Sequence, residues 1–150
     1  MRKSAKRSIT VKIILDANIF VSAVFGGIPA QAVVRALRED AWISSDIQKE
    51  LYSLSHPLSK RLSPEKLKIW NEEFLPLIAG MKVAEVSHSL HLSRDPKDDM
   101  YLSPAKTVSA DFLVTGDLDL LSITKEKLKT VGLERLSIVT PRVFLERAKK

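Results

Sequence analysis

The sequence contains no cysteine, no apolar stretch of membrane-spanning length and no glycine-rich phosphate loop. Without cysteine, disulfides, thiolate zinc sites and thiol nucleophiles are excluded, so any metal must be bound through oxygen or imidazole. Charged residues interrupt the apolar stretches before about 18 residues, and no apolar signal segment follows the basic N-terminal residues. We therefore expect a cytoplasmic protein without a membrane partner.

The positive charge is unevenly distributed along the chain. The net charge is +6, but residues 1–10 hold four basic side chains and no acidic one, which leaves 20 basic against 18 acidic residues in the other 140. We expect residues 1–10 to be a flexible extension, which either contacts phosphates or is simply solvated. Residues 11–150 are long enough to form one domain with a real core.

Short apolar runs alternate with helical patterns through most of the chain. This alternation predicts an α/β fold, a Rossmann-like three-layer domain with a mainly parallel sheet of four to five strands flanked by helices. The expected strands are residues 11–15, 41–43, 81–86, 111–115 and 136–139.

Serine and proline residues indicate where the helices begin and end. A helix over 29–39 follows a Gly26-Gly27 break, and Ser44 or Ser45 caps the next one. We expect further helices after Ser63-Pro64, Asp95-Pro96 and Thr140-Pro141. Two internal prolines predict interruptions: Pro76 ends or kinks its helix, and Pro104 produces a kink or a restart capped by Ser103.

Acidic residues follow two of the predicted strands. Asp16 ends the first strand, and Asp117 follows the fourth, with Asp119 close behind. Asp98 and Asp99 open a helix that returns toward the sheet. Because ligands of open parallel sheets bind outside the carboxyl ends of the strands, we expect these side chains to share one crevice.

Glu50 is a further candidate for the same crevice. With Ile47 at zero and steps of about 100°, Leu51 lies near 40° and Glu50 near 300° on the helical wheel. Glu50 therefore flanks the apolar stripe. It is placed to point along the core boundary into a cleft.

Several carboxylates in one crevice require protons or a cation. At about 4 Å, each pair of charges costs roughly 1 kcal/mol in water and about 4 kcal/mol at an effective dielectric of 20. Mg²⁺ or Mn²⁺ suits such a set, because these ions take oxygen ligands and share their shell with phosphate and water. We predict that Asp16 binds such an ion.

Four segments, in this order and spacing, resemble the PIN domain family, and particularly its VapC-like members, which are toxins of toxin–antitoxin pairs. The segments are "ILDANIF", "SSDIQKELYSL", "RDPKDDMYL" and "ADFLVTGDLDLL". The resemblance runs from about Val11 to Arg142 and implies that residues 11–150 form a PIN domain. It departs from the family at Pro104, where an unbroken helix rich in alanine and leucine is expected.

The resemblance also implies a function and a set of site residues. It implies a Mg²⁺- or Mn²⁺-dependent endoribonuclease in which a metal-activated water attacks the phosphodiester of an RNA substrate. A small antitoxin and a second copy of the chain are the implied protein partners. The implied metal ligands are Asp16, Glu50, Asp99 and Asp117, with Asp98 and Asp119 as alternates and Asn18 and Thr115 in supporting roles.

Every acidic candidate also has a purely structural interpretation. Asp16 is placed to cap the following helix, Glu50 fits a helix surface, and Asp117 fits a turn after Gly116. Asp98 and Asp99 suit the first turn of a helix electrostatically. The sequence does not decide between these roles and metal binding at any single position.

Two other functions are compatible with the sequence. A noncatalytic RNA-binding or scaffold module would keep the fold without turnover. A phosphatase with Asp16 as nucleophile would need a second acid two residues later, where this chain has Asn18.

Overall fold

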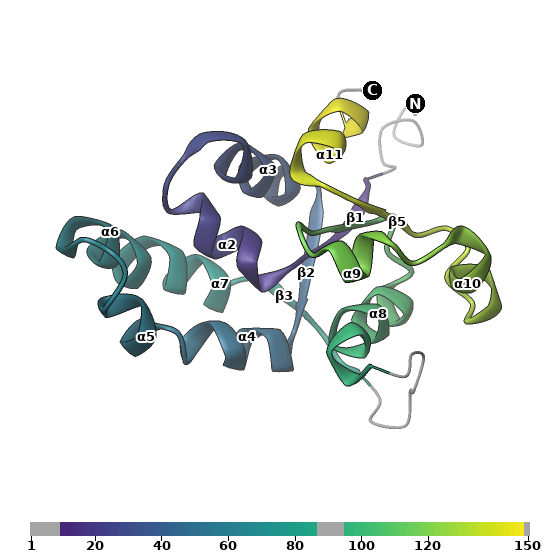
Figure 1. Ribbon diagram of the computed structural model, residues 1–150, viewed down its shortest axis with the longest axis horizontal. Helices are drawn as coiled ribbons and strands as arrows, with labels where there is room; N and C mark the ends of the chain where they lie inside the picture. Colours follow the sequence, from purple (N-terminus) through teal and green to yellow (C-terminus); the bar gives the residue numbers. More distant parts are fainter. Residues whose placement is uncertain (1–9, 87–94, 149–150) are drawn as a thin grey trace, which may run out of the picture.

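The computed structural model describes residues 10–86 and 95–148. Short strands run through its centre (Figure 1). They form one parallel sheet in the order β3-β2-β1-β4-β5, which confirms the predicted fold class. Each expected strand is present, with ends moved by one or two residues. The strands are β1 (Lys12–Leu15), β2 (Asp40–Ser44), β3 (Lys82–Ala84), β4 (Phe112–Val114) and β5 (Ser137–Val139).

The central strand β1 forms the middle of the core. Ile13 and Ile14 are fully buried, and Leu15 is 1% exposed. In register, Ile14 lies between Trp42 of β2 and Leu113 of β4. Because the strands are parallel, their carboxyl ends lie at one edge, and the residues after β1, β2 and β4 meet there.

Helices cover both faces of the sheet. The strand order moves one way from β1 to β3 and the other way to β4 and β5, so right-handed crossovers place the connecting helices on opposite faces. The helices are α2 (Ala17–Ala23), α3 (Gly27–Arg38), α4 (Ser45–Tyr52), α5 (Ser55–Ser59), α6 (Pro64–Ile69), the π-helical turn η1 (Trp70–Phe74), α7 (Leu75–Ala79), α8 (Pro96–Val108), α9 (Leu118–Leu121), α10 (Lys125–Thr130) and α11 (Pro141–Ala148).

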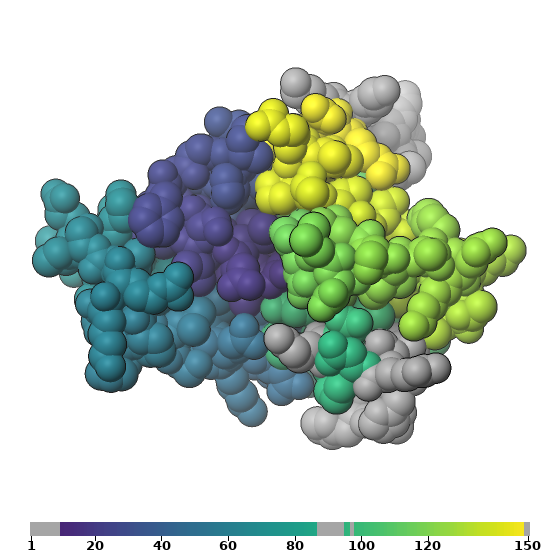
Figure 2. Space-filling model, viewed as in Figure 1, coloured from purple at the N-terminus to yellow at the C-terminus, as the bar shows by residue number. Residues whose placement is uncertain are grey.

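Segments that are far apart in the sequence pack against one another. Helix α11 lies beside α3, so that residues near the C-terminus cover a helix near the N-terminus (Figures 1 and 2). Helix α8 packs on β1 and β3. An aromatic contact joins α11 to the sheet. The rings of Phe112 of β4 and Phe144 of α11 meet edge-to-face, with their centroids 5.5 Å apart.

Several helix boundaries follow from the predicted caps. Ser44 caps α4 by accepting from the N–H of Ile47 at 3.1 Å, and Ser63 caps α6 by accepting from Lys66 at 3.2 Å. Gly26 and Gly27 have φ of 82° and 72°, a conformation that favours glycine, and they separate α2 from α3 as predicted.

The two internal prolines have different effects on their helices. Helix α8 is continuous from 96 to 108, so the predicted restart capped by Ser103 is wrong; Pro104 is buried inside the helix. Before Pro76 the helix changes to the π-helical turn η1, and the proline lies in the first turn of α7, where its missing N–H costs little. The short helices α5, α9 and α10 lack a strong periodic pattern in the sequence and were not predicted.

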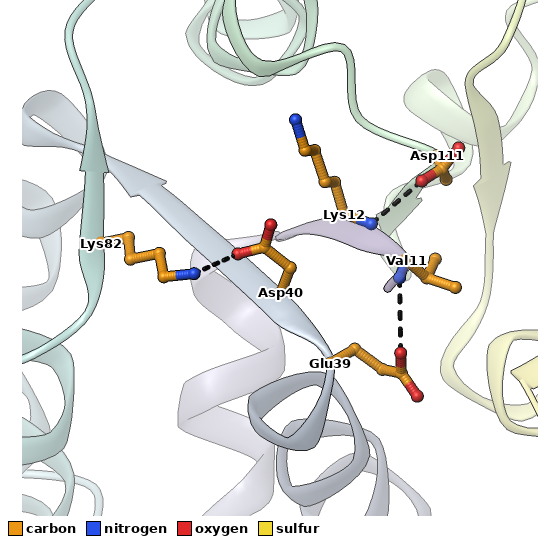
Figure 3. A network of polar contacts seen from close by, with 6 residues as sticks. All are labelled: Val11, Lys12, Glu39, Asp40, Lys82 and Asp111. Atoms are coloured by element: carbon orange, nitrogen blue, oxygen red, sulfur yellow. Dashed lines mark hydrogen bonds and ion pairs between the residues drawn. The ribbon is translucent and has the colours of Figure 1, made fainter. Parts of the chain in front are cut away.

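The amino edge of the sheet is held by polar contacts (Figure 3). The N–H of Lys12 donates to Oδ2 of Asp111 at 3.0 Å, and Lys82 pairs with Oδ1 of Asp40 at 2.6 Å. Burial raises the pKa of Asp40, but the hydrogen bond and positive charge of Lys82 outweigh it, and the net pKa lies below 3.8. This network joins strands and lies opposite the edge that carries the acidic candidates.

The predicted extension, residues 1–10, lies outside the described residues except for Thr10. No helix of the described ranges has the length and apolarity to cross a bilayer alone, and the α2–α3 pair, bent by 118°, reaches those limits only in combination.

Candidate active site

Asp16 lies at the carboxyl end of β1 and is 3% exposed. Its backbone N–H continues the sheet by donating to the carbonyl of Val114 at 2.9 Å. Its Oδ1 accepts from the N–H of Asn18 at 3.0 Å and thereby caps α2. The structural interpretation of Asp16 is therefore correct, but a cap needs neither this degree of burial nor the further contacts described below.

Thr115 supports Asp16 from the neighbouring strand end. Its hydroxyl donates to Oδ2 of Asp16 at 2.6 Å and accepts from the N–H of Asp117 at 2.9 Å. Thr115 is fully buried, and its own N–H is held by the carbonyl of Val139 at 2.9 Å. One hydroxyl thus couples the loop after β4 to the carboxylate after β1.

Tyr101 is a third partner of Asp16, and sequence reasoning missed it. Its hydroxyl donates to Oδ1 of Asp16 at 3.0 Å and accepts from the N–H of Ala17 at 3.3 Å. Burial, the charge of Asp16 and then that of Glu50 raise the pKa of Tyr101 well above its ordinary value of 10. A phenol is protonated at neutral pH even at its ordinary pKa, so its hydrogen is available to Asp16.

Glu50 lies close enough to this group to act on it electrostatically. It is on α4, which begins directly after β2, and its side chain is exposed. Its negative charge contributes to the raised pKa of Tyr101. Two carboxylates from separate elements, Asp16 and Glu50, therefore act on one buried hydroxyl.

Asp117 and Asp119 continue the chain from β4 and are both exposed. Oδ1 of Asp117 accepts from the N–H of Asp119 at 2.9 Å, which caps the short helix α9. The hydrogen bond from the N–H of Asp117 to Thr115 holds this loop next to Asp16. The side chain of Asn18 is also exposed, and its contact with Asp16 is made by its backbone.

Asp98 and Asp99 occupy the first turn of α8, and both side chains are half-buried. Asp98 precedes Tyr101 by three residues, a spacing that places two side chains on the same side of a helix. Asp99 precedes it by two residues, about 200° around the helix axis. Helical phase therefore places Asp98, rather than Asp99, on the side of α8 that reaches Asp16.

The acidic candidates do not form a tight cluster. Among the residues that the structure describes, no three His, Asp or Glu side chains are arranged to hold a metal ion. The fold instead brings the candidates to one edge, and Figure 1 shows α2, α4, α8 and α9 near that edge.

Asp16 also has no cationic partner in the described part of the chain. Its three direct donors are an amide and two hydroxyls, and none of the ion pairs there includes it. Its carboxylate and that of Glu50 present only oxygen donors, which is the donor chemistry of a hard divalent cation. These residues therefore fit Mg²⁺ or Mn²⁺ in kind, although they supply only part of a shell.

A separate groove lies between α3 and α11. Its volume is about 660 Å³, and arginines from both helices line it, namely Arg35, Arg38 and Arg142. None of the acidic candidates contributes to it. The groove is thus distinct from the edge that carries Asp16.

Comparison with known proteins identifies the fold family. A model of the PIN domain matches residues 12–119, well over half of the chain. The chain belongs to the PIN domain family. This family has a nuclease-type fold. The matched residues include Asp16, Glu50, Asp99 and Asp117. An uncharacterized protein of Methanocaldococcus jannaschii, MJ1680, is 28% identical over 153 aligned positions, and the match covers 95% of this PIN protein and 94% of the relative.

Proposed function

We propose that this PIN domain is a divalent-metal-dependent endoribonuclease that acts at the carboxyl edge of its sheet. The observation that carries the proposal is the state of Asp16. Its carboxylate is buried, held by three hydrogen bonds and left without a cation among the described residues. The three hydrogen bonds offset part of the cost of burying this charge, and a cation bound when the site functions would offset more of it.

The chain's own residues supply orientation at this site. Thr115 and Tyr101 hold the plane of the Asp16 carboxylate from opposite oxygens, and Thr115 fixes the loop that carries Asp117. Glu50 and Asp117 are exposed and therefore accessible to a substrate. Mg²⁺ or Mn²⁺, when bound by Asp16 with Glu50, Asp117 and Asp99 or Asp98, activates water and offsets charge on a phosphoryl group.

The proposal extends to RNA as the substrate. It also includes a toxin role with an antitoxin partner, a homodimer and a cytoplasmic location. The toxin role, the antitoxin partner and the homodimer are supported by the resemblance to VapC-like proteins, and the net charge of +6 supports only the choice of RNA. Co-purification with a small protein encoded in an adjacent reading frame would support the toxin role. A PIN protein that is encoded alone and harmless on overexpression would contradict it.

RNA cleavage with purified protein tests the proposed activity. We expect endonucleolytic cleavage in Mn²⁺ or Mg²⁺, none in EDTA, and loss of cleavage in Asp16→Asn with the fold retained. Intact RNA across varied substrates, together with no divalent-ion binding, would remove the proposal.

The second candidate is an RNA-binding or scaffold module without turnover. The absence of a tight acidic cluster among the described residues favours it. RNA affinity that is unchanged by EDTA and by Asp16→Asn, without cleavage, would establish this function instead. RNA affinity that is lowered both by EDTA and by Asp16→Asn would instead favour the nuclease.

A further inference from the structure

Asp16 has little room left for another ligand. A carboxylate offers about four acceptor positions, two on each oxygen. Oδ1 accepts from the N–H of Asn18 and from the hydroxyl of Tyr101, both at 3.0 Å, so both of its positions are used. Oδ2 accepts from Thr115 at 2.6 Å and from no other group in the described chain. One position, on Oδ2, is left.

Tyr101 is held firmly in this arrangement. It is 7% exposed, and its hydroxyl accepts from the N–H of Ala17 while it donates to Asp16. Ala17 is itself 1% exposed, and the Tyr101 hydroxyl is the hydrogen-bond partner of its buried N–H. The single hydroxyl hydrogen is thereby directed at Oδ1.

The one unused acceptor position, on Oδ2 of Asp16, decides how this carboxylate binds a cation. Ca²⁺ takes six to eight oxygen ligands and often binds a carboxylate through both oxygens, whereas Mg²⁺ needs near-octahedral geometry with few protein ligands. Two-oxygen binding at Asp16 would require Oδ1 to release a hydrogen bond. One-oxygen binding through Oδ2 requires no change.

We propose that Tyr101 is a positioning residue that restricts Asp16 to one-oxygen coordination through Oδ2 and so selects Mg²⁺ or Mn²⁺ over Ca²⁺. This inference rests on the proposed metal-dependent function of the same site. It assigns a role to a residue that makes no contact with the ion itself.

The two hydroxyls on Asp16 have different consequences for selectivity. Removal of the Tyr101 hydroxyl frees a position on Oδ1, so that each oxygen has an unused acceptor position. Removal of the Thr115 hydroxyl frees a second position on Oδ2, while Oδ1 stays fully used. Selectivity for ion size should therefore respond to Tyr101 and not to Thr115.

Calorimetric titration of the full-length protein with Mg²⁺, Mn²⁺ and Ca²⁺ tests this inference. In Tyr101→Phe we expect the Ca²⁺ dissociation constant to fall about tenfold relative to that of Mg²⁺. Changes of this size are typical when a group that orients a metal ligand is removed. In Thr115→Val we expect weaker binding of all three ions at an unchanged ratio. Tyr52, the other tyrosine of the chain, is exposed on α4, and Tyr52→Phe is the matched control.

Each outcome separates this inference from the proposed function. Binding that Asp16→Asn abolishes, with the same ion ratio in Tyr101→Phe as in wild type, overturns the role of Tyr101 alone. An equal shift in Thr115→Val also overturns it. Wild-type binding that Asp16→Asn leaves unchanged removes the metal site and this inference together.

A second measurement needs no Tyr101 variant and therefore does not depend on its folding. Infrared difference spectra of the ion-loaded wild type against Asp16→Asn report the separation of the antisymmetric and symmetric carboxylate stretches. One-oxygen coordination gives the wide separation that we expect with Mg²⁺. A narrow separation, typical of two-oxygen coordination, would contradict the proposal.

Discussion

Thr115 donates its hydroxyl hydrogen to Oδ2 of Asp16 over 2.6 Å, and both side chains are buried. The same hydroxyl accepts from the N–H of Asp117, so one oxygen atom organises two strand ends. Thr115→Val leaves the carboxylate and this N–H without their partner. We expect it to lower the free energy of unfolding by about 1–3 kcal/mol.

The matched variant Thr115→Ser keeps the hydroxyl and loses only a methyl group. We expect Mn²⁺-dependent RNA cleavage to fall about 10- to 100-fold in Thr115→Val and to stay near wild type in Thr115→Ser. Urea unfolding and initial cleavage rates measure the two effects. Equal behaviour of the two variants would mean that the hydroxyl is irrelevant.

A pair of neighbouring variants on α8 decides whether Asp98 or Asp99 is the metal ligand from that helix. The spacing of family motifs selects Asp99, whereas helical phase places Asp98 on the side of Tyr101. We expect Asp98→Asn to lower Mn²⁺ affinity at least as strongly as Asp99→Asn, measured by calorimetry. A loss of Mn²⁺ affinity in Asp99→Asn alone would show that motif spacing identifies the ligand better than helical phase does.

Glu50 is expected to affect chemistry without affecting stability. Its side chain is exposed, but its charge reaches the buried hydroxyl of Tyr101. Glu50→Gln should lower cleavage about 10-fold or more at an unchanged melting temperature, because surface substitutions usually change stability by less than about 0.5 kcal/mol. Glu126→Gln, on the exposed surface of α10, is the control and should change neither quantity. Full activity in Glu50→Gln would exclude this residue from the site.

Much of the fold follows from local patterns in the sequence. The buried run before Asp16, the caps at Ser44 and Ser63 and the Gly26-Gly27 break each specify a boundary by a local physical rule, and the structure has all of them. The restart at Ser103 failed because tertiary packing overrides a missing N–H: Pro104 is buried in a continuous helix.

The candidate site was only partly accessible from the sequence. Asp16 was found because it lies at a strand end, where topology fixes the location, whereas Thr115 was implied only by the resemblance to the PIN family. Tyr101 was missed because an aromatic residue in a helical stripe is indistinguishable from core; the available signal was that a buried phenol needs a hydrogen-bond partner. The choice between Asp98 and Asp99 depends on helix rotation, which motif spacing does not specify.

The pair at the amino edge of the sheet predicts a pH-dependent stability. The pKa of Asp40 is lower in the folded protein than its ordinary 3.8, so Asp40 adds stability above that pH, and this stability is lost as the pH falls through the folded-state pKa. Lys82 is 61% exposed, and water screens the pair. Lys82→Met should therefore cost less than about 1 kcal/mol at pH 7.

The same comparison at acid pH provides the internal control for Lys82→Met. Below the folded-state pKa, Asp40 is protonated in both proteins, so the difference in unfolding free energy should vanish. Urea unfolding at a series of pH values, from pH 7 down through the folded-state pKa, measures it. A difference that persists at the lowest pH would assign the effect of Lys82 to packing on Trp42, whose ring centre lies 5.6 Å from Nζ.

Ion-linked stability gives the last prediction and needs no substrate. A ligand that binds only the folded state stabilises it by about 2.7 kcal/mol at a concentration 100 times its dissociation constant. Mn²⁺ should therefore raise the melting temperature of the wild type, because it neutralises the buried charge of Asp16. Asp16→Asn removes that charge, and its melting temperature should not respond to Mn²⁺, whereas the control Glu126→Gln should respond fully. An equal response in Asp16→Asn would place the bound ion elsewhere on the protein.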